Sequence, residues 1–309
     1  MCYCKIVVVI PMYNAALTIC NTIKSVLSQK NVNLQIIVVN HGSCDGSVAL
    51  IQGISKDIHI ISIERKKNEK RSASKPLNTG IRYALLEMQD YVDGNTFFLR
   101  LDSDDIFVCD TALYQLAKKY RKGIKLINGK ICIYNSTKRN IIKYGVNDKY
   151  RTREQLLNGS AYAMAHHSTL ISFFLLKKLI IENGFCYAEN IGYGEDFDLS
   201  LRVIERCKDD EMIYCDNSIM LKRADGETIS NTMKIRTIIK DHIFIFSKHK
   251  SISKSLKISV YLWFLFEMLG GFGKAVNSKR QMPINKYMIK EKMSYKLVEE
   301  AFLLMEDKI

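Results

Sequence analysis

The sequence predicts an α/β fold built on a doubly wound, mostly parallel sheet. Strand-like and helix-like patterns alternate four times between residues 5 and 120, as in strands joined by crossover helices. The first strand, residues 5–10, is almost wholly β-branched, which is typical of a strand covered on both faces. Polar motifs directly follow three of the strands, at the strand ends where ligands bind in such sheets.

The other elements can be taken in chain order. After the first strand and a turn at 11–14, we expect strands at 34–39, 58–63 and 97–101 and helices at 16–27, 47–54, 76–88 and 110–120. Pro76 starts a helix because its missing N–H has no partner to lose there, and Asp110 is expected to cap the next one. Beyond them we expect a hairpin at 125–134 and 140–144, helices at 152–157 and 195–206, and an apolar segment at 166–174.

Composition limits the classes of protein. The 309 residues are 47% hydrophobic and carry a net charge of +14, so a packed core is expected and wholesale disorder is not. We divide the chain into an α/β domain, 1–230, and a basic helical region, 231–309, which holds 15 Lys and Arg against 7 Asp and Glu. The charge indicates an anionic partner. Nucleic acid is disfavoured because no recognised nucleic-acid-binding motif accompanies it.

The cysteines and the apolar runs indicate where in the cell the protein is expected. The nine cysteines are scattered, which suits a reduced cytosolic chain, and Cys2 and Cys4 have no second pair with which to hold zinc. The N-terminus shows no leader pattern. The longest apolar run, 258–273, is shorter than the ~20 residues of a membrane span, so we expect a buried or interfacial helix. We expect a cytoplasmic protein whose basic region binds the inner face of the membrane. Alternatively, the basic region is a helical cap or forms an oligomer contact.

Three carboxylates end the fourth strand. Asp102, Asp104 and Asp105 directly follow the apolar run 97–101. Carboxylates crowded at the end of a buried strand repel one another unless a positive charge is present. A divalent cation shared with a substrate diphosphate would supply it, whereas an ordinary acidic turn is the simpler alternative.

Several segments together resemble glycosyltransferase family 2, the inverting enzymes of the GT-A fold. The similarity covers roughly residues 5–230 and is carried by 6–14, 25–29, 36–47, 77–81, 101–105 and 192–199. The resemblance implies a GT-A fold with a C-terminal helical extension and a dependence on Mn²⁺ or Mg²⁺. It also implies transfer of a sugar from a nucleotide-diphosphate donor to a hydroxyl of a cell-surface polysaccharide or glycolipid.

The resemblance implies a role for each acid. Asp104 would ligate the metal, and Asp102 would contact the ribose and help to hold the metal. Asp196 would be the general base that deprotonates the acceptor hydroxyl, with Glu195 orienting it. As alternatives, Asp105 caps the following turn, and Glu195 and Asp196 simply begin a helix near its positive end.

Donor contacts are implied around the strand ends. The residues are Pro11, Tyr13, Asn14, His41, Ser43, Asp45, Arg71, Lys75, Asn78, Asp102 and Ser103. Arg71 and Lys75 belong to a stretch, residues 65–75, whose other cations are expected on a solvated loop face. His166 and His167 occupy the place where the family lines its acceptor pocket, although a structural pair of histidines fits equally well.

Two positions depart from the family pattern. His41 stands where the family usually has an Asp that accepts from uracil N3–H, so UDP is expected with CDP as a contender. Asp225 stands where a His is common, in a closing loop in which Lys222 or Arg223 can pair with diphosphate oxygens. Two other functions stay open: a non-catalytic sugar-binding or nucleotide-binding subunit of the same fold, and a sugar-nucleotide nucleotidyltransferase. The latter is disfavoured because residues 11–14 form no Gly-rich loop.

Overall fold

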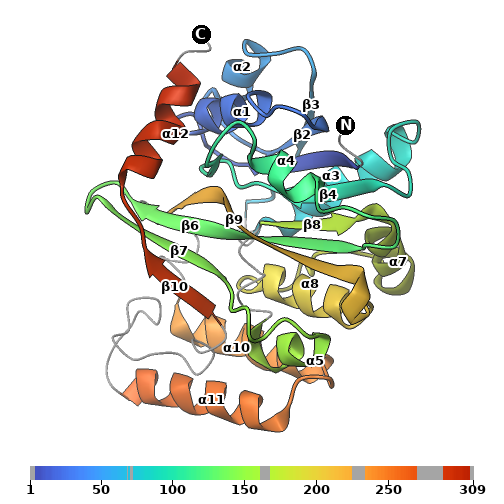
Figure 1. Cartoon of the computed structure of the whole chain (residues 1–309). Helices are drawn as coiled ribbons and strands as arrows, with labels where there is room; N and C mark the ends of the chain where they lie inside the picture. Colours follow the sequence, from blue (N-terminus) through green and yellow to red (C-terminus); the bar gives the residue numbers. More distant parts are fainter. Residues whose placement is uncertain are drawn as a thin grey trace.

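A mixed sheet runs through the part of the chain that the structure describes (Figure 1). The structure is a computed structural model, and it describes residues 4–67, 69, 72–160, 168–224, 234–269 and 288–306. Its strands are β1 (Lys5–Met12), β2 (Asn33–His41), β3 (Ile58–Ile63), β4 (Thr96–Arg100), β5 (Ile106–Phe107), β6 (Leu126–Asn135), β7 (Asn140–Val146), β8 (Thr169–Ser172), β9 (Met212–Arg223) and β10 (Met288–Lys292). The main path of the sheet has the order β10-β7-β6-β8-β4-β1-β2-β3, and β9 pairs with β6 and β5.

The predicted parallel sheet is confirmed for the N-terminal strands. β1 pairs in parallel with both β2 and β4, and β2 pairs in parallel with β3. Alternate side chains of β1 enter two different cores: Val7 and Val9 pack on one face of the sheet, and Ile6, Val8 and Ile10 on the other. Because both faces are covered, the strand is apolar throughout instead of alternating with polar residues.

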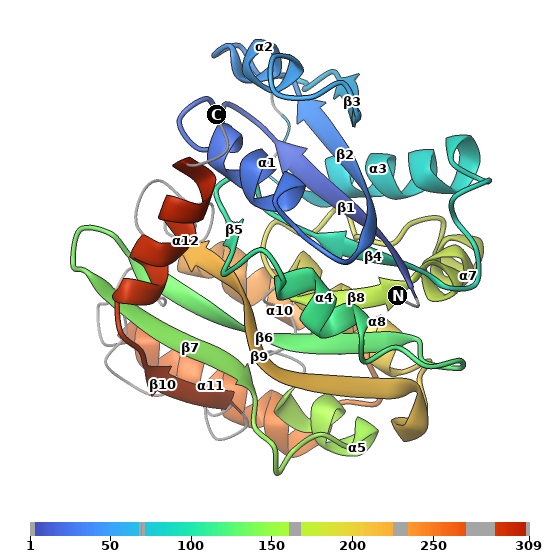
Figure 2. The same cartoon turned by 45° about the horizontal axis from the view of Figure 1, so that its top comes forward.

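Helices cover both faces of this sheet (Figure 2). Those of the α/β part are α1 (Ile19–Leu27), α2 (Ser47–Gln52), α3 (Ser74–Glu87), α4 (Ala112–Ala117), α5 (Arg153–Gln155), α7 (Phe173–Asn183) and α8 (Glu195–Ile204). Gly80 brings α3 close to the sheet, since a Cβ at that position would lie 2.4 Å from Val9 Cγ1. The predicted cap at Asp110 is wrong: its carboxylate pairs with Lys30, and Thr111 precedes α4 without a side-chain cap.

The second half of the sheet is largely antiparallel. β6 and β7 form the predicted hairpin, and β8 inserts between β6 and β4, antiparallel to both. β9 returns in parallel beside β6 and ends at Arg223, next to the short strand β5. This arrangement brings the end of β9 to the acidic residues that follow β4.

The C-terminal region contributes more than helices. Its described elements are α10 (Ile235–Lys248), α11 (Lys254–Leu269), β10 and α12 (Lys296–Glu306). The sequence did not predict β10, which pairs antiparallel with β7. Val298 and Ala301 of α12 share a core with Ile19 of α1. Residues on either side of the proposed boundary at 230 therefore share one sheet and core, and the boundary itself stays a prediction. Within the described ranges, no helix has the length and apolarity required to cross a bilayer.

Candidate active site

The carboxyl ends of β1 and β2 are tied together by hydrogen bonds. Asn14 N donates to Ser43 Oγ at 2.9 Å, and Cys44 N donates to Asn14 Oδ1 at 2.9 Å. Asn14 adopts a φ of 48°, in the left-handed region that Asn tolerates better than most residues. Pro11 pairs with Val39 close to the ends of both strands. The predicted donor residues Pro11, Asn14 and Ser43 are therefore gathered at one edge of the sheet.

Two further contacts fix the loops around β1. The Arg65 guanidinium lies 4.2 Å from the centre of the Tyr13 ring, a cation–π distance, so the loop after β3 covers the end of β1. Thr18 Oγ1 donates to the carbonyl oxygen of Ser103 at 2.9 Å, which connects the turn before α1 to the acidic motif. Tyr13 and Ser103 thus lie in loops that these contacts join, and their donor roles stay predictions; Arg65 is not merely a solvated cation.

Asp45 braces these loops. Its Oδ2 accepts from Ala16 N at 2.9 Å, and its Oδ1 accepts from Ser47 N at 3.2 Å and from the Ser47 hydroxyl. Partial burial opposes ionisation, but the Ser47 and backbone hydrogen bonds hold the pKa of Asp45 below its ordinary value. Because both carboxylate oxygens join the turn before α1 to the start of α2, Asp45 has a structural role, and its predicted donor contact stays a prediction.

Glu69 lies against the predicted base-binding histidine. Glu69 Oε1 is 3.2 Å from His41 Nε2, and Glu69 Oε2 is 3.2 Å from Lys75 Nζ. Burial lowers the pKa of His41 even with this carboxylate beside it, so its ring is neutral near pH 7. Lys75 also donates to the Glu64 carbonyl at 3.0 Å. His41 and Lys75 therefore meet at a carboxylate that the sequence analysis did not single out.

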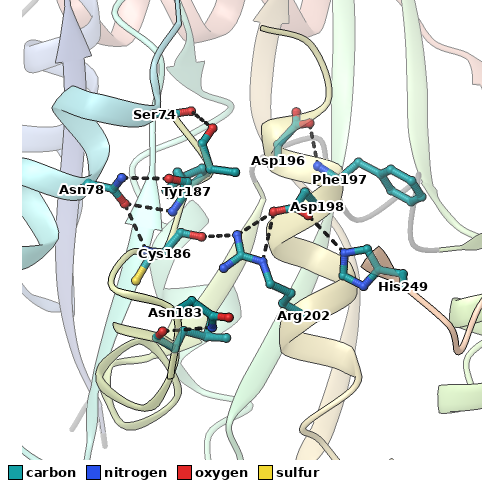
Figure 3. Close-up of polar contacts among 12 residues, drawn as sticks. Ser74, Asn78, Asn183, Cys186, Tyr187, Asp196, Phe197, Asp198, Arg202 and His249 are labelled. Atoms are coloured by element: carbon teal, nitrogen blue, oxygen red, sulfur yellow. Dashed lines mark hydrogen bonds and ion pairs between the residues drawn. The ribbon is translucent and has the colours of Figure 1, made fainter. Parts of the chain in front are cut away.

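Asn78 has a structural role that corrects the predicted donor contact. Its Nδ2 donates to the Tyr187 carbonyl at 2.8 Å and to Glu189 Oε1 at 2.9 Å. Its Oδ1 accepts from the backbone N–H groups of Cys186 and Tyr187. The side chain is buried, and its amide is fully used in fastening α3 to the chain that leads into α8 (Figure 3).

Arg100, the last residue of β4, joins the two acidic motifs. Its Nε lies 2.8 Å from Asp102 Oδ1, and its Nη1 lies 2.9 Å from Glu195 Oε1. Burial opposes the charge, but Asp102 and Glu195 raise the pKa of Arg100 well above its ordinary value, so it stays a cation. The acids after β4 and the acids at the start of α8 therefore line one site, as the predicted mechanism requires.

The end of β9 supplies a second cation. Lys222 Nζ lies 3.4 Å from Asp102 Oδ2 and 3.9 Å from Asp105 Oδ2, and Arg223 N donates to Asp105 Oδ1 at 3.1 Å. Burial opposes the charge of Lys222, but Asp102 and Asp105 raise its pKa. Burial raises the pKa of Asp105 well above its usual range. Asp105 thus fastens β9 to the acidic motif. Lys222 places a positive charge beside Asp102 and Asp105.

Asp104 has the surroundings expected of a metal ligand. No described side chain pairs with its carboxylate, and burial followed by the neighbouring Asp102 raises its pKa. A divalent cation that takes its other ligands from donor phosphates and water fits such a group. The described residues contain no cluster of three His, Cys, Asp or Glu side chains that would form a complete cation site. Asp102 fits the metal less well, because Arg100 and Lys222 contact its oxygens.

Glu195 and Asp196 begin α8. The preceding Gly194 adopts a φ of 83°, a conformation that favours glycine. Asp196 Oδ1 accepts from Phe197 N at 2.7 Å (Figure 3). Burial, and after it the Asp196 charge, raises the pKa of Glu195 although Arg100 opposes the shift. Glu195 and Asp196 therefore do begin a helix, as the alternative interpretation held. The contact between Glu195 and Arg100 also places these two acids at the site.

The C-terminal region positions this helix start. Asp241 of α10 is buried, and its Oδ2 accepts from the backbone N–H groups of Gly192 and Tyr193, both at 3.0 Å. The ring of His242, the next residue on α10, lies near those of Tyr193 and Phe197. The loop that delivers Glu195 and Asp196 is therefore held by a helix that follows the α/β domain in sequence.

A second buried cluster fastens the far end of α10 to α8 (Figure 3). Arg202 Nη2 lies 2.6 Å from Asp198 Oδ2. His249 Nε2 lies 3.1 Å from Asp198 Oδ1, and its Nδ1 lies 3.0 Å from Glu205 Oε1. Burial opposes protonation, but the hydrogen bonds to Asp198 and Glu205 raise the pKa of His249 above its ordinary value. Both ring nitrogens face carboxylates, so the charged ring donates from each.

This cluster predicts a pH-dependent stability. Because the folded pKa of His249 exceeds its unfolded value, the stabilisation is fully present below about pH 6.5 and is lost as the pH rises through the folded pKa. We expect His249→Gln to lower the free energy of unfolding by about 1.5–3 kcal/mol at pH 6, the scale for hydrogen bonds to charged groups, and by less at pH 9. Urea unfolding of both proteins at the two pH values measures this, and an equal loss at both would contradict it.

Four predicted residues lie outside the described part of the chain. They are Arg71, His166, His167 and Asp225. The donor, acceptor and closing-loop roles assigned to them stay predictions.

With this geometry established, comparison with known proteins identifies the family. A family model described as "Glycosyl transferase family 2" matches residues 7–180. The chain belongs to glycosyl transferase family 2. The matched span runs from β1 into α7, so it contains the loops after β1 and β2 and the acidic motif after β4 but ends before Glu195 and the region that follows.

Relatives and solved structures agree with this family assignment. An uncharacterized glycosyltransferase of Rickettsia conorii is 35% identical over 112 residues, which are 36% of this chain and 17% of that protein. The structure of S. aureus TarS 1-349 with UDP-GlcNAc has a TM-score of 0.61 at 15% identity, over 88% of this chain and 74% of that one. The mannosyltransferase PcManGT of Pyrobaculum calidifontis, with GDP-Man and Mn²⁺, has a TM-score of 0.55 at 14% identity, over 98% and 85%. These structures show the GT-A fold of the family.

Four residues of the site were not found by sequence reasoning. Arg100 had a signal, since it is a cation inside the apolar run 97–101 that ends in three acids. Glu69 lay within a basic stretch and therefore looked like a solvated loop residue. Asp241 and His249 gave no sequence signal, because their partners lie some 50 residues earlier in the chain and the contacts arise only from packing.

Proposed function

We propose that this protein transfers a sugar from a nucleotide-diphosphate donor to an acceptor hydroxyl, with inversion at the anomeric carbon, and that it requires Mn²⁺ or Mg²⁺. The observation that carries the proposal is the position of Arg100, which contacts Asp102 on the donor side and Glu195 on the acceptor side. A transferase needs both sides within reach of one sugar ring. A nucleotide-binding subunit without catalysis has no need for this connection.

Each group has a role in the proposed reaction. Asp196 removes the proton from the acceptor hydroxyl as its oxygen attacks the anomeric carbon. Glu195, held by Arg100, orients Asp196 and the acceptor. Asp104, with help from Asp102, would hold a divalent cation, which when bound supplies Lewis-acid stabilisation of the departing diphosphate. Lys222 adds positive charge on the same side.

UDP is the proposed nucleotide of the donor, and Glu69 supports it. A carboxylate accepts hydrogen bonds, so Glu69 beside His41 can receive uracil N3–H at the place where the family usually has an Asp. The amino groups of cytosine and guanine are also hydrogen-bond donors, so Glu69 could accept from these bases as well. Neighbours of this fold have been crystallised with UDP-GlcNAc and with GDP-Man, so the base is decided by a direct comparison of nucleotides.

The acceptor is proposed as a sugar hydroxyl in a cell-surface polysaccharide or glycolipid. This proposal rests on the family resemblance, with His166 and His167 as candidate lining residues. A nucleotide-release assay with and without Mn²⁺, run over a panel of nucleotide sugars, would identify the donor sugar. Product analysis with the best donor would then identify the acceptor.

Removing Asp104 should abolish metal-dependent nucleotide binding. We expect UDP to raise the melting temperature of the natural protein only when Mn²⁺ is present, and more than CDP or GDP does. Asp104→Asn should weaken this binding by more than about tenfold, because loss of even an outer contact to a metal ligand costs about 10–100-fold in metal affinity. Thermal unfolding across a nucleotide titration measures both effects.

Asp90→Asn is the matched control, since Asp90 is exposed and precedes β4 (Thr96–Arg100), whereas the acidic motif follows the other end of that strand. It should leave the UDP-dependent shift unchanged. A shift with CDP alone would reassign the base while leaving the transfer reaction in place. No shift with any nucleotide would overturn the proposed function in favour of a non-catalytic role, and an unchanged shift in Asp104→Asn would remove that residue from the metal site.

A further inference from the structure

Helices α10 and α11 carry a strongly basic surface. Between residues 234 and 262 the chain has seven Lys and Arg and one acid, Asp241. That acid is buried and accepts backbone hydrogen bonds from Gly192 and Tyr193, so it presents no carboxylate to solvent. Figure 1 shows α11 at the lower edge of the molecule with α10 next to it, and the rings of Phe246 and Tyr261 join the two helices at 5.5 Å.

Large aliphatic side chains lie exposed among these cations. Ile243 of α10 and Ile258 and Leu262 of α11 are 51%, 57% and 48% exposed. Ile258 and Leu262 are four residues apart and so share one side of α11, with the exposed Lys254 one turn before them. We define the basic face as the exposed residues Arg236, Lys240, Ile243, Lys248, Lys250, Lys254, Ile258 and Leu262.

We infer that the basic face binds the surface of an anionic lipid bilayer. Cations near such a surface are each attracted by about 1 kcal/mol, and exposed aliphatic groups on the same helices gain by entering the boundary between headgroups and acyl chains. Nucleic acid would use the cations, but aliphatic side chains offer no ring on which bases stack. A second copy of the chain would place two positive surfaces against each other, which is unfavourable.

The basic face is fixed to the active site. Asp241, on the buried side of α10, holds the loop before Glu195, and His249, just past the end of α10, contacts Asp198 on α8. A membrane contact at α10 and α11 would therefore set the orientation of α8 relative to the bilayer. The lipid binding itself does not depend on the proposed transfer reaction, so the two can fail separately.

Vesicle cosedimentation of the full chain tests the inference. We expect the protein to sediment with vesicles of phosphatidylcholine and phosphatidylglycerol in equal parts, to stay in solution with phosphatidylcholine alone, and to dissociate at high salt, which screens surface charge. Lys240→Gln/Lys248→Gln/Lys254→Gln should reduce partitioning by about a hundredfold, from about fivefold for each cation. Ile258→Ser/Leu262→Ser should also reduce it.

Matched variants separate this surface from total charge and total exposed apolar area. Lys118→Gln/Lys119→Gln/Lys122→Gln removes three exposed cations at the end of α4, and Leu86→Ser/Ile181→Ser removes two exposed aliphatic residues elsewhere. Both should bind like the natural protein, and an unchanged urea midpoint confirms that each variant is folded. Equal binding to neutral vesicles, equal losses in the control variants, or a dimer that requires Ile258 and Leu262 would each overturn the inference.

Discussion

Replacing Asp196 with Asn should abolish sugar transfer and leave donor binding intact. The substitution removes the group that takes the acceptor proton, and loss of a positioned general base typically lowers kcat about 10²–10⁴-fold. The Asn side chain keeps an oxygen that can accept from Phe197 N, the bond that the Asp196 carboxylate makes at 2.7 Å, so the start of α8 should be preserved. Initial rates of nucleotide release, together with the UDP-dependent thermal shift, measure both parts.

Glu195→Gln is the comparison that assigns the base. In the proposed mechanism Glu195 orients the reacting groups through its contact with Arg100, so its neutralisation should lower kcat less than Asp196→Asn does. The opposite ranking, with turnover retained in Asp196→Asn and lost in Glu195→Gln, would make Glu195 the base. Loss of the UDP-dependent shift in Asp196→Asn would show instead that Asp196 belongs to the donor site.

Replacing Arg100 with Met should destabilise the fold as well as stop transfer. Arg100 is 7% exposed and pairs with Asp102 and Glu195, and its guanidinium lies 5.9 Å from the centre of the Tyr187 ring. Removing one partner of a buried ion pair leaves uncompensated charge and costs about 3–5 kcal/mol. Urea unfolding measures this loss, and a change below about 0.5 kcal/mol, the usual range for surface substitutions, would show that Arg100 does not hold the site together.

A double variant separates charge from packing at this position. Arg100→Met/Glu195→Gln removes the carboxylate that loses its cation in Arg100→Met, whereas Asp102 keeps its contact with Lys222, so the double variant should be more stable than the single variant. A coupling of at least about 1 kcal/mol is expected for groups in direct contact. Arg100→Lys retains the charge but lacks the planar fork that contacts two carboxylates at once, and it should be intermediate in stability. Additive effects of the two substitutions would contradict the direct coupling.

Much of the fold follows from local pattern. The run 58–63 was predicted as a strand with the bounds that the structure gives, because it places four β-branched isoleucines among six residues between polar turns, a composition that favours a strand. Helix starts were less predictable. α1 begins at Ile19 and not at residue 16, since Ala16 N is held by Asp45 from the next loop. The short strand β10 had no strong local signal and exists through its pairing with β7.

Some site residues could likewise be predicted from the sequence, and others could not. Asp104 and Asp196 were found from the sequence because their residue types and spacing indicate the chemistry directly. Asn78 was assigned to the donor because it lies in a family motif, but its amide is used by residues 186–189 on a distant segment. Asp45 also accepts hydrogen bonds from Ala16 N and Ser47 N, which its place in the motif did not indicate. A motif identifies which residues matter, whereas the partner that occupies a side chain is known only after the segments have packed.

The sequence by itself determined the alternation of strands and helices up to about residue 120, the acidic motif after β4 and the membership in glycosyl transferase family 2, because these depend on residue type and short-range spacing. Only the tertiary structure showed that Arg100 bridges Asp102 and Glu195, that Glu69 stands beside His41, and that α10 holds the loop before Asp196. Those contacts join residues that lie far apart in sequence. Their energies come from burial and from charge pairing in space, which no local pattern of residues specifies.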